Sequence, residues 1–97
     1  MAPDMNPKPI LYIKPGCPWC SQALDFFAAQ GLALDVRDVI ASKADMEHML
    51  KISEQTRTPT FEYGSFVVAD FSVDEFLAKL AQAPAIQREL GLTGGKH

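Results

Sequence analysis

Two cysteines, Cys17 and Cys20, are the residues of this 97-residue chain whose type and spacing are best suited to chemistry. They are the only cysteines in the sequence, and Pro18 and Trp19 stand between them. Two thiols at this spacing can close a small disulfide and open it again, which is the basis of thiol–disulfide exchange. The pair therefore predicts reversible redox chemistry.

Two alternative roles of the cysteine pair stay open at this point. A closed zinc site needs four ligands, and only His48 and His97 remain as further soft ligands. Both cysteines could instead be small buried hydrophobic residues without chemistry. We interpret His48, which lies in the middle of a predicted helix, as a solvated surface residue, and we place no metal site in the chain.

The composition predicts a single soluble domain over residues 1–97. With 47% hydrophobic and 22% charged residues, the chain suits one modest core. The net charge of −3 provides no basic field for polyphosphate, which argues against nucleic acid as a partner. Residues 1–9 lack the apolar region of a signal peptide, and no apolar run is long enough to cross a membrane. We expect a cytoplasmic monomer, in a compartment where ordinary thiols stay reduced.

The elements around the cysteine pair place it at the start of a helix. Ile10 to Lys14 is an apolar run typical of a central strand, and Pro15-Gly16 ends it. From Pro18 to about Gln30 a helix is predicted, closed by Gly31. Its apolar stripe consists of Cys20, Ala23, Leu24 and Phe27. The motif therefore sits where a strand passes into a helix.

The rest of the chain alternates in the same manner. The further predicted elements are a half-exposed edge strand at 34–39, a helix from Ser42 to about Ser53, a hairpin of 60–63 and 66–68, a helix capped by Ser72 and Glu75, and a short helix at 84–90. In the helix that begins at Ser42, we expect Met46, Met49 and Leu50 to be buried. The order β-α-β-α-β-β-α predicts a four-stranded mixed sheet with helices on both faces.

These residues together resemble the glutaredoxins, a family within the thioredoxin-like fold. The resemblance rests on Lys14 at a strand end, the Cys17-Pro18-Trp19-Cys20 motif, Thr58-Pro59 before a hairpin, and the cap at Ser72. It covers roughly residues 9–81 and implies an α/β three-layer sandwich, with 82–97 as a C-terminal extension. It also implies that the peptide bond between Thr58 and Pro59 is cis.

The helix start explains how the two cysteines would differ. The free N–H groups of the first turn and the helix dipole stabilise a thiolate at Cys17 and lower the pKa of this thiol, and Lys14 adds a nearby cation. Cys20 lies one turn further on the apolar stripe and should be more buried. We therefore expect Cys17 to be the nucleophile and Cys20 the resolving thiol.

The resemblance also predicts the contacts of a thiol substrate. Thr58, beside Pro59, would offer its backbone to an extended substrate. Lys14 and Arg57 are candidates for the glycine carboxylate of glutathione, and Trp19 is expected to be exposed and able to shield the thiolate or meet a partner. Ser72 caps the last long helix, whose N–H groups would meet the γ-glutamyl carboxylate.

One position departs from the family pattern. Ala69-Asp70 stands where Gly-Gly is usual, and Phe71, which follows, is expected in the core. Asp70 brings a side chain and a negative charge to a place where backbone should approach a ligand closely. This substitution weakens the expectation of glutathione.

The resulting functional prediction is a thiol–disulfide oxidoreductase that reduces disulfides or glutathione mixed disulfides. It holds no tightly bound cofactor, and glutathione is its expected co-substrate. One alternative is a dithiol electron donor fed by a reductase instead of glutathione. Another is a module that binds an iron–sulfur cluster with glutathione. Disulfide-containing proteins are the expected partners in either redox version.

Overall fold

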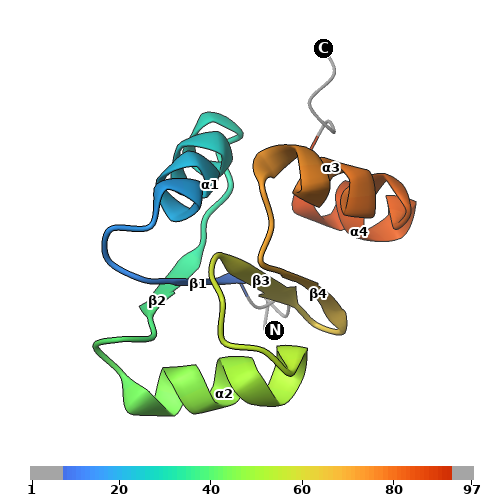
Figure 1. Ribbon diagram of the computed structural model, residues 1–97. Coiled ribbons are helices and arrows are strands. Elements are labelled where there is room, and N and C mark those ends of the chain that lie inside the picture. Colours follow the sequence, from blue (N-terminus) through green and yellow to red (C-terminus); the bar gives the residue numbers. More distant parts are fainter. Residues whose placement is uncertain (1–7, 93–97) are drawn as a thin grey trace, which may run out of the picture.

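A computed structural model describes residues 8–92 of the chain. The expectations for the first seven residues and for the tail from Thr93 to His97 lie outside the described residues. In chain order the elements are β1 (Ile10–Ile13), α1 (Pro18–Ala29), β2 (Asp35–Asp38), α2 (Lys43–Ser53), β3 (Thr60–Tyr63), β4 (Phe66–Ala69), α3 (Val73–Ala81) and α4 (Pro84–Leu90). Each agrees with its predicted element to within a residue or two, and the short last helix is present (Figure 1).

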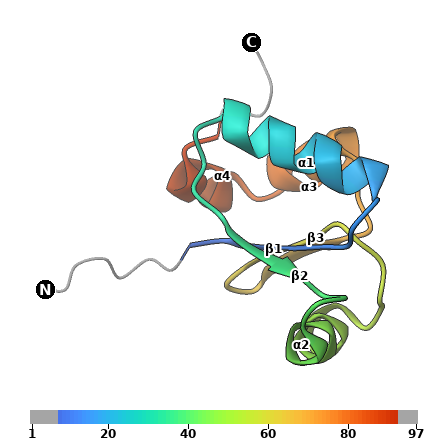
Figure 2. The same cartoon turned by 90° about the vertical axis from the view of Figure 1, so that its left-hand side faces the viewer.

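The four strands form one mixed sheet in the order β2-β1-β3-β4. β1 is parallel to β2 and antiparallel to β3, and β3 is antiparallel to β4. Figure 2 shows α1, α3 and α4 on one face of this sheet and α2 on the other. The arrangement is the thioredoxin-like three-layer architecture, and β2 is an edge strand as predicted.

The main core lies between the sheet and α1, α3 and α4. Three fully buried rings form its centre: Phe27 of α1, Phe61 of β3 and Phe76 of α3, with ring centroids 4.9 to 5.3 Å apart. Phe71 is also buried in this cluster, as expected. Because these rings connect α1 and α3 to the same strand, they fix the position of α3 relative to α1, which carries the cysteine pair.

A smaller cluster fills the space between the sheet and α2. It consists of Tyr12, Val39 and Met49, with Met46 and Ile52 packed against it. Tyr12 and Leu11 alternate along β1, so Tyr12 faces α2 while Leu11 faces the main core. Strand β1 therefore contributes side chains to the cores on both faces of the sheet.

The prediction that Leu50 is buried was wrong. Its side chain is 46% exposed, whereas Met49 is fully buried. The small cluster covers only a narrow stripe of α2, and Met46, Met49 and Ile52 occupy it at three-residue intervals. A residue next to Met49 is rotated by about 100° around the helix and lies outside this stripe.

Within residues 8–92, none of the helices combines the length and apolar character that a membrane crossing requires.

Candidate active site

Cys17 occupies the N-cap position of α1. β1 ends at Ile13, and the chain then turns through Gly16, whose φ of +76° is a conformation that favours glycine. Cys17 has extended backbone angles, and Pro18 is the first residue of the helix. The Cys17 sulfur accepts a hydrogen bond from the backbone N–H of Cys20 at 3.1 Å. A thiol at this position therefore meets a free donor of the first helical turn.

The structure joins Cys17 and Cys20 in a disulfide, with the two Cα atoms 5.2 Å apart. The two sulfurs differ in surroundings: Cys20 is 2% exposed and lies on the buried face of α1, while Cys17 is half-buried at the helix start. The expected difference in burial between the two cysteines is confirmed. An incoming reactant can reach Cys17 more easily than Cys20.

The segment before β3 packs against the Cys17 sulfur. The Thr58 hydroxyl oxygen lies 3.7 Å and its carbonyl oxygen 3.8 Å from Cys17 Sγ. Thr58 and Pro59 are both buried, and the peptide bond between them is cis, as expected. The Pro59 carbonyl accepts a hydrogen bond from the N–H of Asp70 at 2.9 Å, so this segment is connected to the residue that follows β4.

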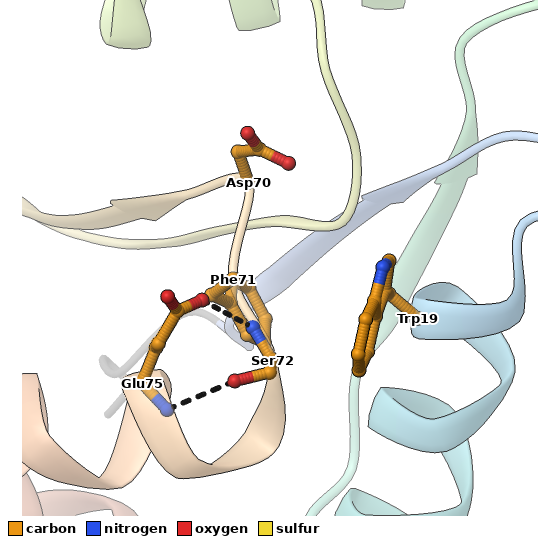
Figure 3. Close-up of a pocket in the computed structure, with 5 residues that line it drawn as sticks. All are labelled: Trp19, Asp70, Phe71, Ser72 and Glu75. Carbon is orange, nitrogen blue, oxygen red and sulfur yellow. Dashed lines mark hydrogen bonds between the residues drawn. The ribbon is translucent and has the colours of Figure 1, made fainter.

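A pocket of about 310 Å³ opens beside the cysteine motif. Its lining consists of Trp19, Asp70, Phe71, Ser72 and Glu75. Figure 3 shows the indole of Trp19 across the pocket from the start of α3, with a face turned toward Phe71 and Ser72. Trp19 is 52% exposed, which confirms the expected exposure of this side chain. The pocket therefore lies between the motif helix and the last long helix.

The start of α3 is closed by a complete capping box. Ser72 Oγ accepts from the N–H of Glu75 at 3.2 Å, and Glu75 Oε1 accepts from the N–H of Ser72 at 2.8 Å. Ser72 thus contributes to the pocket wall, but its own N–H and that of Glu75 already have partners within the protein. These two donors are therefore not free for a ligand carboxylate.

The two predicted basic residues lie outside the pocket wall. Lys14 is half-buried, directly after β1. Arg57 is exposed, and its Nη1 lies 3.3 Å from Oδ2 of Asp70, which forms an ion pair between the segment before Thr58 and the residue after β4. Arg57, which was expected to bind a substrate carboxylate, is therefore next to the carboxylate of Asp70.

Sequence reasoning missed Glu75 and the place of Asp70 in the pocket wall. Asp70 has a φ of +53°, in the left-handed region that glycine adopts most easily. The departure from Gly-Gly was visible in the sequence and pointed to this position. Glu75 was identified only as part of a helix cap. It lines the pocket because the packing of α3 places the first turn of this helix opposite Trp19, which a local pattern does not predict.

Other polar interactions lie on the opposite face of the sheet. The Tyr12 hydroxyl donates to Glu62 Oε1 at 2.7 Å, and burial together with this carboxylate raises the pKa of Tyr12. His48 Nε2 is 3.4 Å from the same oxygen, and the His48 side chain is 49% exposed. His48 is a surface residue, as predicted. His48 is part of α2, which packs on the opposite face of the sheet from α1 and the cysteine motif (Figure 2).

We compared the chain with known protein families and proteins. The family model described as Glutaredoxin matches residues 10–67. No curated protein sequence matches the chain at a significant level.

Several solved structures share the fold. The thioredoxin-like protein BC3987 is 26% identical, with a TM-score of 0.67, covering 74% of this chain and 99% of its own. A glutaredoxin from Brucella melitensis is 25% identical, with a TM-score of 0.62, covering 99% of both chains. A glutathione transferase homolog from Drosophila mojavensis, solved with bound glutathione, is 25% identical with a TM-score of 0.56, covering 87% of this chain and 36% of its own.

The family model spans more than half of the chain, and it includes the cysteine pair, the cis proline and the strands that hold them. The protein belongs to the glutaredoxin family.

Proposed function

We propose that this protein is a thiol–disulfide oxidoreductase in which Cys17 attacks a disulfide and Cys20 resolves the adduct. The observation that carries the proposal is the contrast between the two sulfurs. Cys17 caps α1 beside Thr58 and is partly open to solvent, whereas Cys20 is buried one turn further along. This contrast supports different roles for the two cysteines in one exchange reaction.

The first step begins with the reduced protein. The N–H of Cys20 and the positive end of α1 stabilise a thiolate at Cys17 and lower the pKa of this thiol. The thiolate attacks one sulfur of a substrate disulfide. A bond forms between Cys17 Sγ and that sulfur, the substrate disulfide breaks, and the other sulfur leaves as a thiolate that takes up a proton.

The second step depends on Cys20. Its thiol loses its proton and attacks Cys17 Sγ, which releases the second substrate sulfur as a thiol. The protein is left with the Cys17–Cys20 disulfide and has given two electrons to the substrate. Alternatively, free glutathione attacks the adduct at the substrate-derived sulfur when that sulfur belongs to glutathione, which returns Cys17 as a thiolate and forms glutathione disulfide.

Glutathione is the co-substrate in this proposal. Its support is membership of the family and the related glutathione transferase homolog, which holds glutathione. In this chain Lys14 precedes Cys17 by three residues, Arg57 directly precedes Thr58, and the Thr58 carbonyl oxygen lies 3.8 Å from Cys17 Sγ. These residues would bind an extended thiol tripeptide through its carboxylates and its backbone.

A second candidate keeps the reaction and replaces glutathione by a reductase as the electron donor. Asp70 favours this second candidate, because it places a negative charge beside Arg57, near the position expected for a substrate carboxylate. The capping box also favours the second candidate, because the N–H groups of Ser72 and Glu75 are already bonded within the protein. Both features disfavour a ligand with two carboxylates.

The test is reduction of a glutathione mixed disulfide by NADPH, glutathione reductase and glutathione. We compare the wild type with Cys17→Ser and Cys20→Ser, which are matched because each removes one sulfur of the same pair. Cys17→Ser should abolish turnover. Cys20→Ser should keep reduction of the glutathione mixed disulfide but lose reduction of a protein disulfide such as that of insulin.

Each other outcome has a defined meaning. An active Cys17→Ser variant together with an inactive Cys20→Ser variant would reverse the assigned roles. A wild type that is inactive with glutathione but active with a dithiol reductase system would replace the first candidate by the second. Inactivity in both systems would reject the oxidoreductase.

A further inference from the structure

We propose that the pocket between Trp19 and the start of α3 selects disulfide partners that carry a basic side chain next to the reacting cysteine. The inference rests on the proposed oxidoreductase function and names its class of substrate. The ligand is the ammonium group of lysine or the guanidinium group of arginine, presented by a peptide or protein whose sulfur is attached to Cys17.

The location of the pocket makes such a contact possible during the reaction. Trp19 follows Cys17 by two residues, and its indole forms one wall. The opposite wall is the start of α3, with Ser72 and Glu75 (Figure 3). Because the Trp19 wall lies only two residues from Cys17, we expect the residue next to a substrate cysteine to enter this space while its sulfur is bound to Cys17.

The charges of the wall favour a cation. Of the five lining residues two, Asp70 and Glu75, are carboxylates, and none is basic. The half-exposed indole of Trp19 adds an aromatic face, which attracts ammonium and guanidinium groups. An aromatic face and carboxylates together form the chemistry that recognises lysine and arginine side chains.

Both carboxylates keep the capacity to bind. Glu75 uses Oε1 for the capping box, and its other oxygen has no hydrogen-bond partner within residues 8–92. Asp70 contacts Arg57 at 3.3 Å, but the two side chains are 45% and 76% exposed. An ion pair with this exposure contributes little free energy, so a substrate cation can share or replace Arg57.

The experiment uses three short peptide disulfides that differ only in the residue next to cysteine, which is lysine, glutamine or glutamate. Fully reduced protein is mixed with each symmetric disulfide, and the release of peptide thiol is followed by chromatography at low ionic strength. Each reaction turns one peptide disulfide into two peptide thiols and leaves the protein disulfide between Cys17 and Cys20. The lysine peptide should react about tenfold faster than the glutamate peptide, with glutamine between them.

The variants locate the source of this preference. Glu75→Gln keeps the capping box, because glutamine can accept the same bond, and Asp70→Asn keeps a side chain that tolerates a φ of +53°. Each should reduce the ratio of the lysine to the glutamate rate about two- to threefold. Asp74→Asn is the matched control: it removes one charge from the same helical turn, but Asp74 does not line the pocket.

The outcomes separate this inference from the proposed function. Reaction of all three peptides at rates within about twofold of one another would overturn the preference and leave the oxidoreductase intact. If the ratio of the lysine to the glutamate rate falls equally in Asp74→Asn and Glu75→Gln, the preference comes from the overall negative charge of the protein. This outcome would overturn the role of the pocket. Failure of every peptide to react would reject the proposed function itself.

Discussion

Cys17 is surrounded by groups from two separate parts of the chain. The N–H of Cys20 comes from its own helix, and the hydroxyl of Thr58 comes from the segment before β3. Donors that point at a sulfur stabilise its charged form and lower the thiol pKa. We therefore expect the reactivity of Cys17 to depend on long-range packing as well as on the helix start.

The contribution of the Thr58 hydroxyl can be measured directly. In a Cys20→Ser protein Cys17 is the only thiol, and the formation of its thiolate is followed by ultraviolet absorbance. Thr58→Val keeps the shape of the side chain but removes the hydroxyl, and should raise the pKa of the Cys17 thiol by removing a bond of about 0.5–1.5 kcal/mol. Thr56→Val, at a nearby exposed position, should leave the titration unchanged. An unchanged pKa in Thr58→Val would show that the 3.7 Å contact does not act on the thiolate.

At the scale of elements, α3 both stabilises the fold and forms part of the candidate site. Its capping box uses both Ser72 and Glu75, and its buried residues Phe76 and Leu80 hold it against the main core. The same first turn forms one wall of the pocket. The position of this wall is therefore fixed by a cap and by core packing together.

Loss of the cap should lower the stability of the protein. Ser72→Ala removes the acceptor for the N–H of Glu75 and should reduce the free energy of unfolding by about 1 kcal/mol, measured by urea denaturation. Ser65→Ala, at an exposed position in the turn between β3 and β4, is the control and should change stability by less than about 0.5 kcal/mol. Equal stability of the wild type and Ser72→Ala would mean that solvent satisfies this helix end as well as Ser72 does.

At the scale of the whole molecule, two cores of unequal size flank one sheet. The larger core joins α1, α3 and α4 to the strands, and the smaller one holds α2. β1 contributes Leu11 to the first and Tyr12 to the second. Because both layers share this strand, we expect them to unfold together.

A pair of neighbouring residues on α2 tests this coupling. Met49→Ala removes a fully buried side chain and should lower the global free energy of unfolding by about 2–5 kcal/mol. Leu50→Ala, on the exposed side of the same helix, should cost less than about 1 kcal/mol. Fluorescence of Trp19, on the other side of the sheet, and far-ultraviolet circular dichroism should report the same transition in both variants. Two separate transitions would show that α2 unfolds independently.

The sequence by itself determined the elements and the position of the cysteine pair. Pro18, Ser42 and Ser72 mark helix starts because caps are formed by residues a few positions apart. The alternation of Leu11 and Tyr12 likewise follows from the geometry of a strand. Local chemistry was therefore sufficient to predict the order of the fold and to place Cys17 at the N-terminus of α1.

Only the tertiary structure decided which side chains of α2 are exposed and which residues line the pocket beside the cysteine motif. Leu50 is exposed because the small core cluster covers only a narrow stripe of α2. The pairing of Arg57 with Asp70, and the pocket between Trp19 and Glu75, join residues that are 13 and 56 positions apart. Such contacts depend on the angle and distance at which α1, α3 and the strands pack through their shared core, and no local pattern of residues encodes that geometry.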